Sequence, residues 1–161
     1  MRIAPYILYL FLIAMHEVIW RDVTSIYGVS INFTAFVVVA VAIYKSEMIA
    51  LWFGFLAGLM MAAGLPHSFG LHAVILTIIG LSAYHVRRLL NLDSIYAKLL
   101  LMLAGILVHN VLRVLVDQAD GFIYLLWSSV LPGAVYTAAM TWFFFALKEG
   151  LITYKKLRAI F

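Results

Sequence analysis

The stretch of sequence that decides the fold lies near the middle of the chain, where residues 54–72 read GFLAGLMMAAGLPHSFGLH. Gly54, Gly58 and Ala62 recur every four residues, so in a helix these small residues share one face. Small residues at this spacing let a second helix backbone approach closely inside a membrane. The glycines and the proline of residues 64–70 predict a tight turn into a further apolar helix. The stretch therefore predicts a closely packed pair of membrane helices.

The composition places the whole chain in the same class. Of the 161 residues, 66% are hydrophobic and only 11% are charged, and the mean hydropathy is +1.10. A soluble domain of this size needs a far more polar surface, so an integral membrane protein is the expected class. The chain has no cysteine, which excludes disulfides and thiolate metal sites. We expect residues 1–161 to form one integral membrane domain.

Six apolar segments follow one another with short gaps. A helix needs about 20 residues to cross the hydrocarbon core of a bilayer, and no segment shows the sustained alternation of a barrel strand. The second and third segments are on the short side of that length. The expected fold is all-α, a polytopic membrane protein with six transmembrane helices. The segments are Ile3–Trp20, Val29–Tyr44, Met48–Ala63, Gly70–Val86, Ile95–Val116 and Phe122–Leu147.

The basic residues are concentrated at one set of segment ends. With the amino terminus in the cytoplasm, nine of the eleven lysines and arginines fall on the cytoplasmic side, whereas Arg21 and Arg113 lie toward the other side. Because basic residues favour cytoplasmic loops, we expect both termini to be cytoplasmic. The same asymmetry explains the pI of about 9.4 without a nucleic-acid partner. In the tail, we expect Lys155, Lys156 and Arg158 to contact anionic lipid or a cytoplasmic partner.

Polar residues interrupt the fifth segment. His109, Arg113 and Asp117 are spaced by four, so they share one helical face, and Asn110 lies beside them. Ionisable residues inside a membrane segment are costly and point to a function. Three interpretations stay open: a local pair between Arg113 and Asp117, a polar contact to another helix or subunit, and a ligand site.

The first segment carries a similar polar group near its end. Glu17 and Arg21 are spaced as an ion pair along one helix, and Glu17 is also a candidate partner for Arg113 at a similar depth. His16 and Glu17 resemble the start of a zinc-protease motif, but that motif needs a second histidine where this chain has Trp20. No nucleophile elbow or phosphate-binding loop occurs in the sequence. We therefore expect no catalytic residue, no metal and no cofactor.

Several short motifs, in their order and spacing, resemble the rod shape-determining protein MreD family. The resemblance covers about residues 27–90 and 125–150. Members of that family often carry an aspartate where this chain has Ala62, so no polar role is carried over to that position. The matching pieces are Tyr27-Gly28, Asn32, Lys45, residues 54–58, the turn at residues 64–70, Gly70-Leu71-His72-Ala73, Arg87-Arg88 and the LPGAVYTAA run from Leu131.

The resemblance implies a non-enzymatic subunit of the bacterial cell-elongation complex in the inner membrane. The family works with the single-span protein MreC, and with MreB, RodA and a penicillin-binding transpeptidase. Its fold resembles the substrate-binding subunits of energy-coupling-factor vitamin transporters. In this chain we expect Gly54, Gly58, Ala62, Gly70 and His72 to serve helix packing, within the chain or against a partner helix.

A second function stays open, that of a vitamin-binding subunit of such a transporter. This function needs an enclosed polar pocket that opens to the outside. Transporter subunits of that type often show an Ala-x-x-x-Ala motif in the first helix. Here Ala14 has Leu10 four residues before it and Val18 four residues after it, so the motif is missing.

Overall fold

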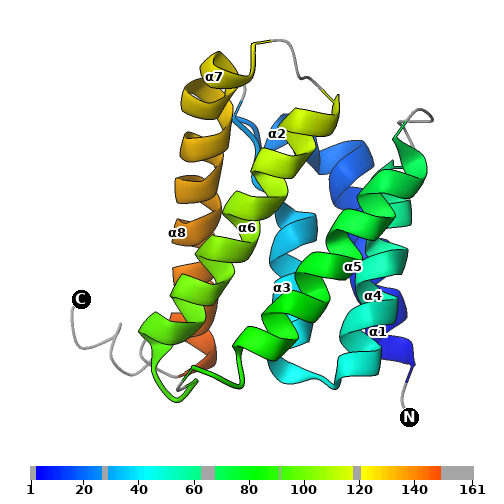
Figure 1. The fold of residues 1–161 in the computed structure, drawn as a ribbon, viewed down its shortest axis with the longest axis vertical. Coiled ribbons are helices and arrows are strands. Elements are labelled where there is room, and N and C mark those ends of the chain that lie inside the picture. Colours follow the sequence, from blue (N-terminus) through cyan, green and yellow to red (C-terminus); the bar gives the residue numbers. More distant parts are fainter. Residues whose placement is uncertain (1–2, 27–28, 63–67, 91, 118–120, 150–161) are drawn as a thin grey trace.

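The computed structural model describes residues 3–26, 29–62, 68–90, 92–117 and 121–149, and these confirm the all-α prediction. Each of the six predicted apolar segments holds one helical rod (Figure 1). The first and the last rod each contain a π-helical turn, named η1 and η3. In chain order the elements are α1 (Ala4–Met15), η1 (His16–Trp20), α2 (Arg21–Val23), α3 (Phe33–Tyr44), α4 (Glu47–Met61), α5 (Phe69–Val86), α6 (Ile95–Asp117), α7 (Phe122–Leu125), η3 (Leu126–Val130) and α8 (Leu131–Lys148).

Helix α3 is the centre of the bundle. It contacts α1, α4, α5, α6 and α8, and nine of its 12 residues are buried. Its valine-rich sequence, FTAFVVVAVAIY, gives apolar side chains on every face, as a helix surrounded by other helices requires. At about 1.5 Å per residue it is roughly 18 Å long.

The helix in the second segment begins later than Val29, the predicted start. The side chain of Asn32 caps α3, because its Oδ1 accepts a hydrogen bond of 3.0 Å from the backbone N–H of Ala35. Before the cap, Val29 pairs with Ile26 through two backbone hydrogen bonds instead of continuing a helix. The polar cap residue therefore corrects the predicted boundary to Phe33.

Helices α4 and α5 form the closest pair, and glycines allow it. A Cβ atom on Gly54 would lie 2.6 Å from the carbonyl oxygen of Leu76, and one on Gly58 would lie 2.6 Å from that of His72. Ala62 is fully buried. The small face of α4 is thus occupied by α5 of the same chain, which leaves no room for a partner helix there. The predicted turn at residues 64–70 lies mostly outside the described residues.

Gly70 lies apart from the close contact between α4 and α5. It is exposed in the first turn of α5, and an added Cβ atom would meet nothing within 4 Å. Among the described residues nothing packs against it, so of its two predicted roles only partner docking stays open. His72, two residues later, is fully buried and joins the polar site described below.

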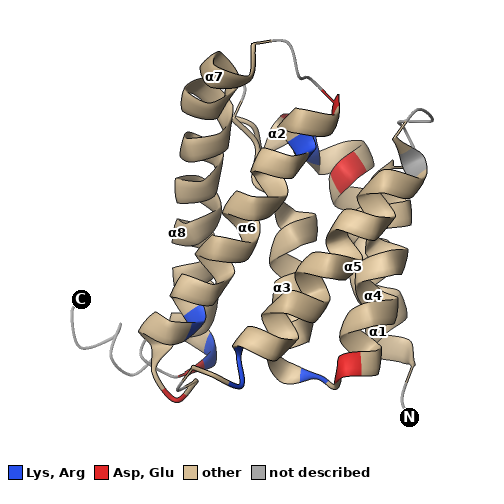
Figure 2. Cartoon of the chain, in the orientation of Figure 1, with Lys and Arg blue, Asp and Glu red and all other residues tan. Residues whose placement is uncertain are grey.

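The charged residues that the structure describes lie toward the two ends of the bundle and are absent from its middle (Figure 2). The upper end in Figure 1 is where α6 ends at Asp117 and α7 begins at Phe122, and the lower end is where α1 begins at Ala4 and α8 ends at Lys148. Large apolar side chains are exposed on the outer faces of the helices. Examples are Ile7, Leu8, Phe11, Trp52, Val74, Ile78, Leu100, Val108, Val135, Trp142 and Phe143.

Two helices among the described residues are long and apolar enough to cross a membrane. They are Ile95–Asp117 and Phe122–Lys148. The helices Phe33–Tyr44, Glu47–Met61 and Gly70–Val86 are apolar but shorter. The length and composition of the described helices thus support two of the six predicted transmembrane helices.

Basic side chains connect the ends of the helices at the lower end of the bundle. Nη1 of Arg87 donates hydrogen bonds of 2.7 and 2.6 Å to the carbonyl oxygens of Ala42 and Ile43. These carbonyls are in the last turn of α3 and have no partner within the helix. Lys98 at the start of α6 forms an ion pair with Glu149 after α8. The ends of α3, α5, α6 and α8 are therefore fixed by charged groups.

Candidate functional site: a polar network and cavity at the upper end

A buried polar network begins at Asn32, the residue before α3. Its side-chain Nδ2 lies 2.6 Å from Nδ1 of His109 and also donates to Oδ1 of Asn110. Its backbone N–H donates to Oγ1 of Thr137 at 3.1 Å. His109 and Thr137 are fully buried. One residue thus links α3 to α6 and α8.

The cap of α3 fixes the orientation of every amide in this network. Because Oδ1 of Asn32 accepts from Ala35, the NH₂ group of Asn32 must face α6. Nδ1 of His109 must then act as an acceptor, which leaves the ring hydrogen on Nε2. Asn110 likewise presents its oxygen to Asn32, so its own NH₂ group stays free for other acceptors. Among the described residues, Nε2 of His109 is buried with no hydrogen-bond partner.

Glu17 lies beside this network, in the π-helical turn η1. Its Oε1 accepts a hydrogen bond of 2.7 Å from Thr34, a fully buried residue of α3. Its Oε2 is 3.8 Å from Nη1 of Arg21, so the expected pair along the helix is present. Glu17 and Arg21 both interact electrostatically with Arg113 across the bundle, but Glu17 forms no ion pair with Arg113. The carboxylate is directed instead toward α3 and Arg21.

A second set of polar contacts lies at the end of α6, around Asp117. Its Oδ2 is 3.7 Å from Nε of Arg113, which is the local pair expected from the sequence. Its Oδ1 is 3.2 Å from Nε2 of His72, a residue of α5 that is 45 positions away. His72 therefore contributes a polar contact between helices, in addition to its place beside Gly58.

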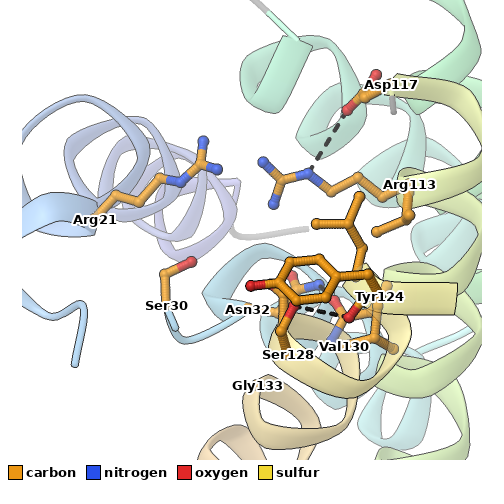
Figure 3. A pocket seen from close by; sticks show the side chains of 13 residues that line it. Arg21, Ser30, Asn32, Arg113, Asp117, Tyr124, Ser128, Val130 and Gly133 are labelled. Atoms are coloured by element: carbon orange, nitrogen blue, oxygen red, sulfur yellow. Dashed lines mark hydrogen bonds and ion pairs between the residues drawn. The ribbon is translucent and has the colours of Figure 1, made fainter. Parts of the chain in front are cut away.

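A polar cavity of about 430 Å³ opens among these residues. Figure 3 shows the guanidinium groups of Arg21 and Arg113 entering from opposite sides and pointing toward one another. The Nη atoms of Arg113 have no partner among the described residues, since only its Nε faces Asp117. The cavity is lined by Arg21, Ser30, Asn32, Asn110, Arg113, Val114, Asp117, Tyr124, Leu125, Ser128, Ser129, Val130 and Gly133.

Both π-helical turns border this cavity. Turn η1 ends at Trp20, directly before Arg21, and η3 contributes Ser128, Ser129 and Val130 to the lining. A π-helical turn inserts one extra residue, which rotates the following side chains by about 100° relative to a regular α-helix. Such turns occur frequently at functional sites. The local backbone thus sets the direction of Arg21 and of the two serines.

His109 and Asn110 both lie against Asn32, and Arg113 forms the local pair with Asp117 that one of the open interpretations expected. Glu17 is bonded to Thr34 and paired with Arg21 instead of Arg113. The structure places Gly54 and Gly58 on the α4–α5 contact, and it buries Ala62 at the end of α4. Lys155, Lys156 and Arg158 lie outside the described residues. Among the described residues, no group of three or more His, Cys, Asp or Glu side chains is placed to hold a metal ion.

Several residues of the site carry no recognisable motif in the sequence. Thr34, Ser30 and Ser128 were not singled out, and Asn32 appeared only within the family resemblance. The one available signal was the presence of polar side chains in otherwise apolar segments, as in the Ser128-Ser129 pair. That signal does not say which of them face one another.

A second, apolar groove lies where α1 packs on α4. Its volume is about 260 Å³. Trp52 and Met48 on its rim are more than half exposed. The groove is lined by Tyr6, Leu10, Met48, Ile49, Trp52, Phe53 and Leu56.

Comparisons with known proteins do not show the function of this chain, so the polar cavity and the apolar groove are the evidence for it. The MreD resemblance and the likeness to transporter subunits stay predictions. No family model matches the chain, and neither a curated protein nor a solved structure matches it.

Proposed function

We propose that this chain is an integral membrane protein whose helical rods lie across the bilayer, with the lower end in the cytoplasm. Exposed apolar side chains on the outer faces of the helices support this, because lipid is the solvent that such a surface suits. At the lower end lie Lys45, Arg87, Arg88, Lys98 and Lys148, whereas the upper end has Arg21 and Arg113. The positive-inside rule favours that orientation.

The short helix α3 is compatible with this placement. A helix of 12 residues is too short for a lipid-facing span. Since α3 is surrounded by five other helices, it does not have to cover the hydrocarbon thickness itself. Before α3, the backbone N–H of Asn32 donates to Thr137, and Ile26 and Val29 bond to each other, as polar backbone groups at membrane depth require.

Within the membrane, we infer that the chain is an MreD-like, non-enzymatic subunit of the bacterial cell-elongation complex. The observation that carries a docking role is the apolar groove between α1 and α4, with Trp52 exposed on its rim. In lipid, helices associate through close van der Waals packing. A single-span partner of the MreC type would place its helix in this groove. The order of the motifs in residues 27–90 and 125–150 supports the choice of family.

Depletion and co-purification together test this function. Cells of the native host depleted of the chain are expected to lose their rod shape, and the wild-type chain is expected to restore it. The chain is then co-expressed with the host's MreC-type protein and purified in detergent. Trp52→Ala should lower the recovered partner, whereas the matched control Trp142→Ala, on an exposed site of α8, should not. Unchanged cell shape and no partner recovery would contradict the proposal.

The polar cavity favours a second candidate, a small-molecule binding subunit of an energy-coupling-factor transporter. In the proposed orientation, the cavity of about 430 Å³ lies at the outer end of the bundle, where such a subunit binds its ligand. This volume is within the usual range of small-molecule sites, about 300–1,000 Å³. Co-purification with an ATPase module and a retained vitamin would select this candidate over the first.

A further inference from the structure

We propose that the upper cavity is an oxyanion site, in which Arg21 and Arg113 bind a phosphate group between them. This site is a property of the chain separate from partner docking, because the docking groove lies between α1 and α4. The ligand class is a phosphate ester or free phosphate.

The two guanidinium groups are the main evidence for an oxyanion site. Arginine side chains stay protonated, so two of them pointing toward one another repel unless an anion lies between them. They come from different rods, Arg21 from the first and Arg113 from α6, and both line the cavity (Figure 3). Arginine forks match the oxygens of a phosphate in a bidentate geometry.

The nearby carboxylates do not fill this role. Glu17 lies 3.8 Å from Arg21 but is hydrogen-bonded by Thr34, and it does not line the cavity. Asp117 does line the cavity, but its two oxygens are engaged by Nε of Arg113 and by His72. Each carboxylate thus meets one edge of a guanidinium, and Nη1 and Nη2 of Arg113 stay available to a ligand.

The neutral lining of the cavity also offers hydrogen-bond donors. The hydroxyl groups of Ser30, Ser129 and Tyr124 have no partner among the described residues, and Ser128 donates to the carbonyl of Tyr124. The free NH₂ group of Asn110 follows from the orientation of Asn32. Arginine nitrogens and amide NH₂ groups can only donate, and each hydroxyl can donate. A lining of this kind selects an acceptor-rich anion.

The cavity is larger than a phosphate group needs, which leaves room for an attached organic group. A lipid headgroup and a soluble phosphate ester share this chemistry. The proposed position at the outer end of the bundle gives access both to the aqueous side and to the outer leaflet. The binding experiment has to separate these two sources.

Thermal unfolding of the purified full chain tests the site, because a ligand that binds the folded state raises Tm. Wild-type protein in a maltoside detergent, which carries no phosphate, is heated with and without inorganic phosphate, and again with added phosphatidylglycerol in place of inorganic phosphate. A rise in Tm with phosphate alone identifies a soluble anion, and a rise with phosphatidylglycerol alone identifies a headgroup. A rise with both identifies a common oxyanion site. No rise with either would overturn the proposal.

Charge variants show whether the binding uses this cavity. Arg113→Gln and, separately, the more exposed Arg21→Gln should weaken binding about 10- to 100-fold, as expected for a lost charge-assisted hydrogen bond. Arg88→Gln removes the same charge at the lower end and should leave binding unchanged. If Arg113→Gln does not fold, Arg21→Gln still decides. Equal binding by Arg21→Gln and wild type would reject the site, while partner co-purification reports on docking separately.

Discussion

Nδ2 of Asn32 lies 2.6 Å from Nδ1 of His109, and this contact joins the start of α3 to the interior of α6 across 77 positions of the sequence. The same side chain caps α3 through Oδ1. One residue therefore determines where the central helix begins and how the ring of His109 is oriented. The upper cavity depends on both, because Asn110 receives its orientation from the same amide.

Replacing Asn32 separates its two roles. Asn32→Ala removes the cap and the donor, and should destabilise the chain by about 2–4 kcal/mol, the sum of a lost cap and a buried acceptor left without its partner. Asn32→Asp keeps an acceptor for Ala35 but cannot donate to His109. Thermal unfolding in detergent should rank wild type above both variants. Equal stability of Asn32→Ala and wild type would contradict the network.

The α4–α5 contact gives a matched pair of glycine substitutions. Gly58→Leu must displace the backbone of α5 near His72, because even a Cβ atom would come within 2.6 Å of that carbonyl oxygen. Gly70→Leu meets open space. Size-exclusion chromatography in detergent should show a loss of folded protein for Gly58→Leu and a normal profile for Gly70→Leu. A normal profile for both would mean that the helices are not packed as described.

The carboxylate of Glu17 should be coupled most strongly to Thr34. A hydrogen bond to a charged group contributes about 1.5–3 kcal/mol, whereas a partly exposed ion pair contributes about 0.2–1 kcal/mol. A double-mutant cycle of Glu17→Gln with Thr34→Val should therefore give a larger coupling energy than Glu17→Gln with Arg21→Gln. Thr141→Val, at a buried threonine that bonds only within α8, is the control.

A second double-mutant cycle, of Glu17→Gln with Arg113→Gln, tests the hypothesis of a direct pair between Glu17 and Arg113. Because Glu17 is engaged by Thr34 and Arg21, we expect its coupling to Arg113 to be smaller than its coupling to Thr34. The free energy of unfolding of the Glu17→Gln, Arg113→Gln double variant, compared with the two single variants, measures this. A larger coupling for Glu17 with Arg113 would reverse the assignment.

Arg87 should stabilise the lower end. Its Nη1 donates to the carbonyls of Ala42 and Ile43, and its guanidinium lies 4.3 Å from the ring centre of Tyr84. Arg87→Ala should cost about 2–3 kcal/mol, because carbonyls at the end of α3 lose a charged donor. Hydrogen exchange at residues 41–44 should rise in this variant. Exchange that stays at the wild-type rate would show that the carbonyls find other partners.

Much of the fold could be predicted from the sequence, because apolar segments and their short gaps are local properties of the chain. Each predicted segment holds a helical rod, and the pairs Glu17–Arg21 and Arg113–Asp117 follow from the helical spacing of four residues. The start of α3 is not predicted correctly, because the apolar segment extends back to Val29. The helix begins only after Asn32, which caps its first turn. The π-helical turns were also missed, since neither leaves a clear pattern in these apolar segments.

Only the tertiary structure decided which side chains and which helices face one another. The spacing of Gly54 and Gly58 indicated a packing face, but only the fold shows that α5 of the same chain fills it. The contacts of Asn32 with His109 and of His72 with Asp117 join residues 77 and 45 positions apart. Side chains along one helix have neighbours set by the helical period. Neighbours on different helices depend on the packing of the whole bundle. The two arginines that face one another in the cavity can therefore be recognised only in the tertiary structure.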